Sequence, residues 1–314
     1  MAVYDKISAA DYNSLQSVVA GVLGKGSGPL GYGQKLNSSQ VALGQPVTIN
    51  EWANLRYDIA NAYLHQNGSA ASLAQANLGD TIRYNASTPI TAYTPIVSGI
   101  SSSAYVVATG QYKTVNKGTS TQTWPGPAGA NWTNQITCTI QLSWSSADAA
   151  RYFFNSGGEI QITTSRSGGS ATPQNTSWTN LCNSAGTMRF GAILPSSGSI
   201  TGTNFYATTS SYSQSMITSA SSPYGANSLR LYALTPGVTL NNNGTSSVLF
   251  LRVDFDDYHA SVYDPYTATY SPDSVNGTFS VSVVTKEAVG TMQPPSLSTS
   301  FTVESPSVSI GAVG

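Results

Sequence analysis

Apolar residues recur at helical spacing in two segments near the start of the chain. In the first segment they stand three or four positions apart and so share one helix face, at Tyr12, Leu15, Val19 and Val22. Ser8 and Asp11 precede them with the spacing of a capping box, in which the two side chains accept each other's backbone amides. The pattern predicts an amphipathic helix that ends at Gly24.

A second segment repeats this pattern. Thr48 and Glu51 have the capping-box spacing, and apolar residues follow at Trp52, Leu55, Ile59 and Tyr63. Residues 8–15 align with 48–55 in their cap, acid, aromatic and leucine positions. An internal repeat and two independently capped helices both account for that alignment. We predict a helical hairpin with a glycine-rich connection, followed by a third short helix over 69–79.

Beyond the first hundred residues the periodicity changes from helical to alternating. Residues 136–144 place Ile136, Cys138, Ile140, Leu142 and Trp144 on one face and polar residues on the other. Further alternating segments cover 160–162, 248–255, 279–283 and 301–303. Turn signals such as Asn276-Gly277 separate these segments. The sequence predicts a mainly β protein with a small α part, in which the helical hairpin precedes an antiparallel β-sandwich or jelly-roll-like domain.

This pattern divides the chain into three consecutive regions. Residues 1–80 form an N-terminal helical region, and residues 105–314 form the β domain. Between them, residues 81–104 are rich in Pro, Thr and Ser, and residues before proline favour extended backbone, which predicts an extended linker. Two short helices bury little apolar surface alone. We therefore expect the helical region to anchor on another chain or on the β domain.

The composition narrows the classes of partner. Charged residues make up 9% of the chain, against roughly 25% in ordinary soluble domains, and the formal net charge is -1. Thirteen scattered basic residues provide no basic face for phosphates, so we expect neither nucleic acid nor an anionic membrane as partner. The hydrophobic fraction of 40% is sufficient for a folded core.

The residues available for chemistry are few. The two cysteines, Cys138 and Cys182, and the two histidines, His65 and His259, have no zinc-ligand spacing, so we expect no metal and no cofactor. His65 is interpreted as a helix C-terminal residue favoured by the macrodipole, and Cys138 as a buried structural thiol. No nucleophile–base motif is present, and we predict no catalytic residue and no enzymatic activity. The first residues also lack an apolar signal-peptide core, and no apolar run is long enough for a membrane span.

An acidic cluster near the end of an alternating segment is the most suggestive site. It comprises Asp254, Asp256 and Asp257 with Tyr258, His259, Tyr263 and Tyr266 close behind. The acids fit a hard-cation site, a glycosidase pair, or a strand end whose carboxylates face water or cap a turn, and we favour the last. The tyrosines suit either a sugar or a subunit interface, and we favour the interface.

Several stretches of the chain resemble one group of known proteins. In the N-terminal region they are residues 1–7, 11–16, 31–34, 52–56 and 65–68, and in the β region they are residues 149–160, 178–181 and 275–281. They resemble virion structural proteins of tailed phages, mainly those that infect marine cyanobacteria. The resemblance implies a protein made in the host cytoplasm without a signal peptide, carried in the virion and devoid of transferable catalytic residues.

Together these features predict a non-enzymatic tail, baseplate, neck or fibre-attachment protein that acts by assembly. We expect it to associate with copies of itself, as a trimer or hexamer, and with other virion proteins. The expected particle-docking residues are Tyr4, Tyr12, Leu15, Trp52, Leu55 and Ile59. The alternative is a glycan-binding module for host-surface recognition that uses the Asp- and Tyr-rich loop from Asp254 to Tyr266.

Overall fold

The structure is a computed structural model, and it separates into two compact units. It describes residues 8–26, 30–77, 93–124, 134–192, 203–259, 262–264, 269–271, 275–289 and 303–314, with the backbone alone over 262–264 and 269–271. The helical unit comprises residues 1–113, 151–158 and 287–305, and the β unit comprises 114–150, 159–286 and 306–314. These units differ from the expected consecutive regions because two later segments belong to the helical unit.

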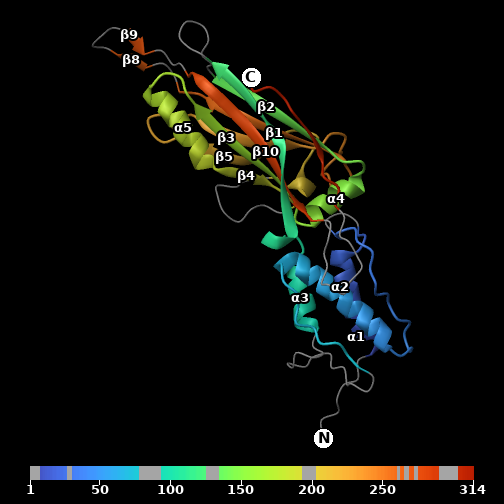
Figure 1. Cartoon of the computed structure of the whole chain (residues 1–314). Coiled ribbons are helices and arrows are strands. Elements are labelled where there is room, and N and C mark those ends of the chain that lie inside the picture. The colour runs from blue at the N-terminus through green and yellow to red at the C-terminus, as the bar shows by residue number, and fades with distance from the viewer. Residues whose placement is uncertain are drawn as a thin grey trace. The chain divides into compact units, whose positions relative to one another are not determined.

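In its described residues the helical unit contains α1 (Ala9–Leu23), α2 (Ile49–Asn67), α3 (Thr94–Ser102) and the 3-10 turn η1 (Thr109–Gln111) (Figure 1). Residues 151–155 of α4 (Ala147–Asn155) also belong to it. Both capping boxes are confirmed. The Asp11 carboxylate accepts from the Ser8 amide at 2.9 Å, and the Glu51 carboxylate accepts from the Thr48 amide at 2.6 Å. Helix α2 ends at Gly68, whose φ of 71° is the left-handed conformation that glycine tolerates best.

The apolar faces of these helices meet one another in a core of their own. Trp52 stacks on Tyr93 with ring centroids 4.7 Å apart, and Tyr12 lies 6.3 Å from Trp52. The five described residues expected to dock on the particle are all buried in this core: Tyr12, Leu15, Trp52, Leu55 and Ile59. Because their side chains are covered by the unit itself, the docking assignment is wrong for them. Tyr4 lies outside the described residues.

Two further expectations about this region are corrected. The described part of the expected extended linker over 81–104 contains α3, because Pro95 stands in the first turn of a helix, where its missing amide is tolerated. The third helix expected over 69–79 is absent from its described part, residues 69–77. In that stretch Leu73 packs into the core instead, and Nε of Arg56 donates a hydrogen bond to the Leu73 carbonyl at 2.9 Å.

In its described residues the β unit contains two sheets, the helix α5 (Pro173–Ala185) and the first four residues of α4. One sheet has the order β1 (Tyr112–Trp124), β10 (Gly277–Ala288), β3 (Glu159–Ser167), β4 (Thr187–Phe190). The other has the order β11 (Ser307–Ile310), β2 (Asn134–Ser143), β7 (Val248–Asp257), β6 (Ser228–Leu234), β5 (Ser213–Ser219). The remaining elements are η2 (Phe205–Ala207) and a small pair, β8 (Val262–Asp264) with β9 (Thr269–Ser271).

The protein is therefore a β-rich mixture of helices and antiparallel sheets. Strand β2 pairs antiparallel with β7, so that Cys138 lies opposite Val253, and β3 pairs antiparallel with β10. Alternation along β2 buries Ile136, Cys138, Ile140 and Leu142, which confirms the predicted inward face. The mainly β prediction holds at this level.

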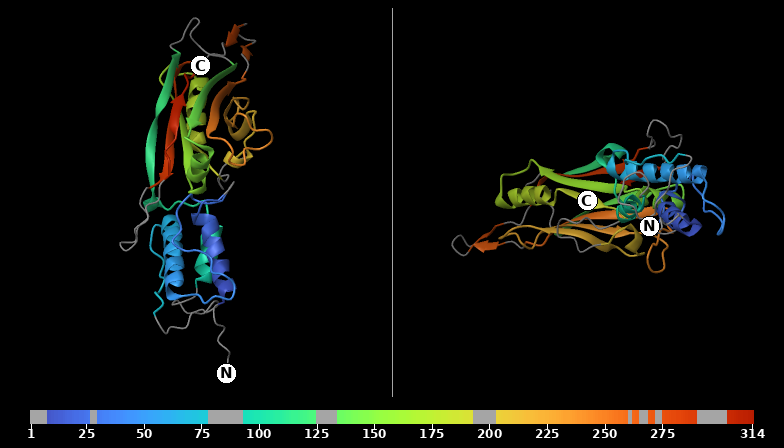
Figure 2. Two further views of the ribbon diagram at one scale, coloured as in Figure 1. Left: turned by 90° about the vertical axis from the view of Figure 1, so that its right-hand side faces the viewer. Right: turned by 90° about the horizontal axis from the view of Figure 1, so that it is seen from below.

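Aromatic side chains join the two sheets and α5 in one core. Phe255 of β7 and Phe279 of β10 have ring centroids 5.3 Å apart, although they belong to different sheets. Trp178 of α5 lies 6.2 Å from the first ring and 5.9 Å from the second. Figure 2 shows α5, in yellow-green, between the two sheets. This position fixes α5 beside β5 and the turn that follows it.

Candidate functional site

The acidic side chains at the end of β7 are buried in ion pairs rather than facing water. Asp254 receives Nη2 of Arg252 at 2.7 Å, and Asp256 receives Nε of Arg230 at 3.1 Å. Gln135 donates to Asp256 at 2.6 Å and to Asp254 at 3.4 Å. Both carboxylates have no exposed surface. The expectation that they face water or cap a turn is wrong, because arginines on β7 and on the neighbouring strand β6 cover them.

Arg230, Arg252, Asp254 and Asp256 form a charge-balanced ion-pair ladder on β6 and β7. Burial raises the pKa of Asp254 above its ordinary value, and the hydrogen bond and charge of Arg252 oppose that rise. The Arg252 guanidinium also packs against the rings of Tyr212 and Tyr232, at 4.6 and 4.8 Å from their centroids. In the described part of the chain, no three His, Cys, Asp or Glu side chains are grouped so as to hold a metal ion.

The last acid of the cluster points to a different neighbour. Asp257 follows Asp256 on the opposite face of β7, and both of its carboxylate oxygens accept from Nε2 of Gln174, at 3.4 and 3.2 Å. Gln174 belongs to the first turn of α5. The strand end is thereby joined to the helix, and Asp257 is 2% exposed.

The residues after β7 support the turn between β5 and β6. The amides of Tyr258 and His259 both donate to Oδ1 of the buried Asn227, at 3.0 and 2.9 Å. The His259 ring packs edge-on against Tyr224, with centroids 4.6 Å apart. Of the other predicted loop residues, Tyr263 lies on β8 with only its backbone described, and Tyr266 lies outside the described residues.

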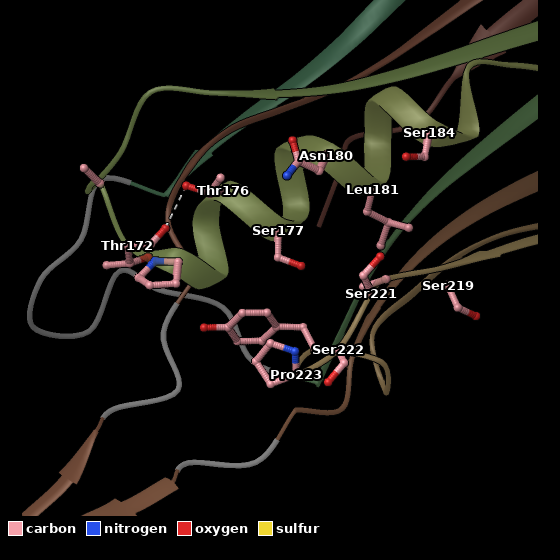
Figure 3. Close-up of a pocket in the computed structure, with 14 residues that line it drawn as sticks. Thr172, Thr176, Ser177, Asn180, Leu181, Ser184, Ser219, Ser221, Ser222 and Pro223 are labelled. Carbon is pink, nitrogen blue, oxygen red and sulfur yellow. Dashed lines mark hydrogen bonds between the residues drawn. The ribbon is translucent and has the colours of Figure 1, made fainter.

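A pocket of about 460 Å³ opens between α5 and the segment 219–224 (Figure 3). Ser177 and Leu181 of α5 point towards Ser221, Ser222 and Pro223 across it. The pocket is lined by Ala171, Thr172, Pro173, Thr176, Ser177, Asn180, Leu181, Ser184, Ser219, Ala220, Ser221, Ser222, Pro223 and Tyr224. Most of these side chains carry a hydroxyl, and none carries a charge. The Asp- and Tyr-rich loop thus supports a pocket whose lining comes from other segments.

Sequence reasoning missed this pocket. Helix α5 was not predicted, although Thr172 caps it through the Asn175 amide at 3.2 Å and Pro173 occupies its first turn. Trp178, Leu181 and Cys182 give it a buried face at helical spacing. Nothing in the sequence of the segment 219–224 indicates that α5 lies beside it.

The helical unit has a second hollow of different character. A groove of about 340 Å³ lies between α1 and α3, and its lining includes Val18, Gly21, Leu30, Ser101 and Tyr105. Leu30 is 54% exposed, and its carbonyl is held by Nδ2 of Asn155 at 2.8 Å. Val18 is also exposed. No charged side chain lines the described groove.

His65 is buried against Tyr32, a lining residue of this groove, and does not lie at an exposed helix end. Its Nε2 lies 2.9 Å from the Ser156 carbonyl, so that nitrogen is the protonated donor. The ring also packs edge-on against Tyr32 at 5.0 Å. Loss of solvation lowers the pKa of His65 to about 4. The expected interaction of a charged imidazole with the helix dipole is therefore wrong, because the buried ring is neutral at pH 7.

None of the helices in the described part of the chain is long and apolar enough to cross a lipid bilayer. A scan against protein-family models, a search of curated proteins and a search of solved structures each found no match to this chain.

Proposed function

We propose that the chain is a non-enzymatic structural component of a tailed-phage virion, in a tail, baseplate, neck or fibre-attachment position. It is made in the host cytoplasm and assembles with copies of itself, as a trimer or hexamer, and with other virion proteins. The resemblance of short stretches such as residues 1–7 and 149–160 to such proteins supports this function, as does the charged fraction of only 9%. A surface with few charges loses little hydration energy when it is covered by a partner.

The observation that carries the proposal is the distribution of exposed apolar residues. Among the described residues, five large apolar side chains of the helical unit are exposed: Val18, Leu30, Leu43, Ile49 and Val106. In the β unit, only Leu240 and Tyr258 are similarly exposed in the described part. Val18 and Leu30 of this set line the same groove, and grouped exposed apolar surface is typical of protein interaction sites. The helical unit is therefore the part that docks on the particle.

The groove between α1 and α3 is the centre of this docking surface. Val18 and Leu30 both line it and are both exposed. The occupant that fits is an apolar segment of another virion protein, because the lining offers no charge for an ionic contact. We therefore assign docking to the exposed groove and not to the buried helix faces.

We interpret the β unit as a two-layered sandwich that projects or packs against symmetry mates. The close contact between Phe255 and Phe279, which belong to different sheets, supports the two-layered arrangement. The buried core of this unit does not use the groove residues. Assembly through the helical unit therefore leaves the β unit free for further contacts.

Incorporation into particles tests this function. Val18→Asp and Leu30→Asp place a charge in the groove, and we expect each to lower the amount of the protein that co-sediments with purified particles by at least about tenfold. Leu240→Asp is the matched control, since Leu240 is 82% exposed in the β unit. Equal incorporation of all three variants would contradict docking through the groove. Absence of the wild-type protein from particles would contradict the virion function itself.

A further inference from the structure

The pocket between α5 and the segment 219–224 presents polar groups that the described protein does not use. Thr172 and Thr176 are engaged in hydrogen bonds of the helix start. Seven other lining side chains hydrogen-bond to no protein group in the described part of the chain: Ser177, Asn180, Ser184, Ser219, Ser221, Ser222 and Tyr224. These side chains come from both walls, so a ligand between them is reached from two sides.

The chemistry of these groups selects the class of ligand. A hydroxyl both donates and accepts hydrogen bonds, and so does each hydroxyl of a sugar. The described lining contains no Asp, Glu, Lys, Arg or His, so an ionised ligand would lose hydration without gaining an opposite charge. The lining therefore favours a neutral ligand that carries several hydroxyl groups.

Apolar surface stands beside these hydroxyls. Leu181 is a buried residue of the lining, and Pro173, Pro223 and Tyr224 add ring surfaces to it. A sugar ring presents C–H groups on its faces and hydroxyls at its edge, and such a face packs well against an aromatic ring. The volume of about 460 Å³ lies within the range of small-molecule sites.

The aromatic wall is held in place before any ligand arrives. Tyr224 packs against the His259 ring at 4.6 Å, and its carbonyl accepts from the Asn227 amide at 2.9 Å. The Asn227 side chain in turn accepts from the amides of Tyr258 and His259. A wall that is already ordered loses less conformational entropy when it binds.

We infer that this pocket is a binding site for an uncharged saccharide. The sugar ring packs against Tyr224 and Pro223, and its hydroxyls hydrogen-bond to side chains of α5 and of the segment 219–224. Recognition is through neutral hydroxyls and not through the carboxylates of Asp254 and Asp256, which are occupied by arginines. This site does not depend on the virion function, because it is defined by the β unit alone.

The test measures binding of sugars to the full chain by saturation-transfer NMR and calorimetry. The probes are glucose, galactose, mannose, N-acetylglucosamine and their disaccharides, with glucuronic acid as the charged comparison. We expect at least one neutral probe to bind. Ser177→Leu, which fills the pocket, and Tyr224→Ala, which removes its aromatic wall, should each raise the Kd at least about tenfold. Asn183→Leu is the matched control, because Asn183 is exposed on α5 outside the pocket.

Thermal unfolding of each variant separates loss of the site from loss of the fold. Loss of binding in Ser177→Leu with an unchanged melting temperature, together with wild-type binding in Asn183→Leu, supports the inference. Failure of every neutral probe to bind the wild-type chain overturns it. Wild-type affinity in both pocket variants also overturns it, since the sugar would then bind elsewhere. Glucuronic acid binding as tightly as the neutral probes contradicts recognition of an uncharged ligand.

Discussion

The two hollows of this protein differ in what lines them. The groove of the helical unit is bordered by exposed Val18 and Leu30, whereas the pocket of the β unit is lined mainly by hydroxyl groups. Neither has a charged side chain in its described lining. A single charge-poor sequence thus produces one surface suited to an apolar protein segment and one suited to a neutral sugar.

Charged residues instead serve inside each unit, and the two units use them differently. In the helical unit, the buried Asp58 accepts hydrogen bonds from the backbone and side chains of Asn37 and Ser38. In the β unit, the buried Asp254 and Asp256 pair with arginines. Buried charge is tolerated in both cases because donors surround it. In both units the surfaces proposed to bind a partner are uncharged, and these buried charged side chains stabilise the fold.

The largest loss of stability is expected for Trp52, which the sequence assigned to docking but which lies in the core. Trp52→Ala removes a buried ring stacked on Tyr93 and should lower the free energy of unfolding by about 3–5 kcal/mol. Leu30→Asp, in the exposed groove, should change it by less than about 1 kcal/mol. Denaturant unfolding followed by circular dichroism measures both. Comparable losses would show that the groove is part of the core.

The second-largest expected effect is a loss of stability of the helical unit at acid pH. The pKa of His65 is lowered to about 4 in the folded protein and lies near 6.5 when the chain is unfolded, so the unfolded state binds the proton first as the pH falls. Stability contributed by the neutral ring is present above pH 6.5 and declines as the pH falls towards 4. Between pH 7 and pH 5 the loss should be about 2 kcal/mol.

His65→Gln is the control for this pH dependence. A glutamine amide can still donate to the Ser156 carbonyl but does not titrate. Denaturant unfolding at pH 7 and pH 5 should show about 2 kcal/mol less pH dependence in the variant than in the wild type. The same dependence in both proteins would rule out His65 as its source.

The smallest effect is expected for the ion pairs of the β unit. Arg252→Met leaves Asp254 without its arginine and should cost about 1–2 kcal/mol of stability, because the arginine side chain is 30% exposed and its charge is partly screened. Arg189→Met is the matched control, since its pair with Glu159 is 3.5 Å long and the arginine is 50% exposed. It should cost less than about 0.5 kcal/mol. Equal costs would show that the ladder contributes no more than a surface pair.

Local sequence signals predicted part of this fold. The capping boxes at Ser8 and Thr48 identified α1 and α2, and strict alternation identified the inward face of β2. Helix α3 was missed because Pro95 was interpreted as favouring extended backbone, whereas a proline in the first turn is compatible with a helix. Local patterns thus identified the two capped helices and the alternating strand, and they missed a helix that has a proline in its first turn.

The binding surfaces depended on contacts that the sequence does not display. An amphipathic face on α1 or α2 reads the same whether it covers a partner or its own core, and here Tyr93 and α3 cover it. The strand register sets Arg230 against Asp254 and next to Asp256, which no spacing along the chain reveals. The pocket joins α5 to the segment 219–224, and these come together only in the folded β unit.

Photocrosslinking from the groove is the most direct test of the central claim, that the helical unit docks on the particle through its exposed apolar groove. A benzophenone amino acid at Leu30 should cross-link to a virion protein other than this chain in purified particles, whereas the same residue at Leu240 should give no cross-link to a different protein. A cross-link from Leu240 without one from Leu30 would contradict the account and place the docking surface on the β unit.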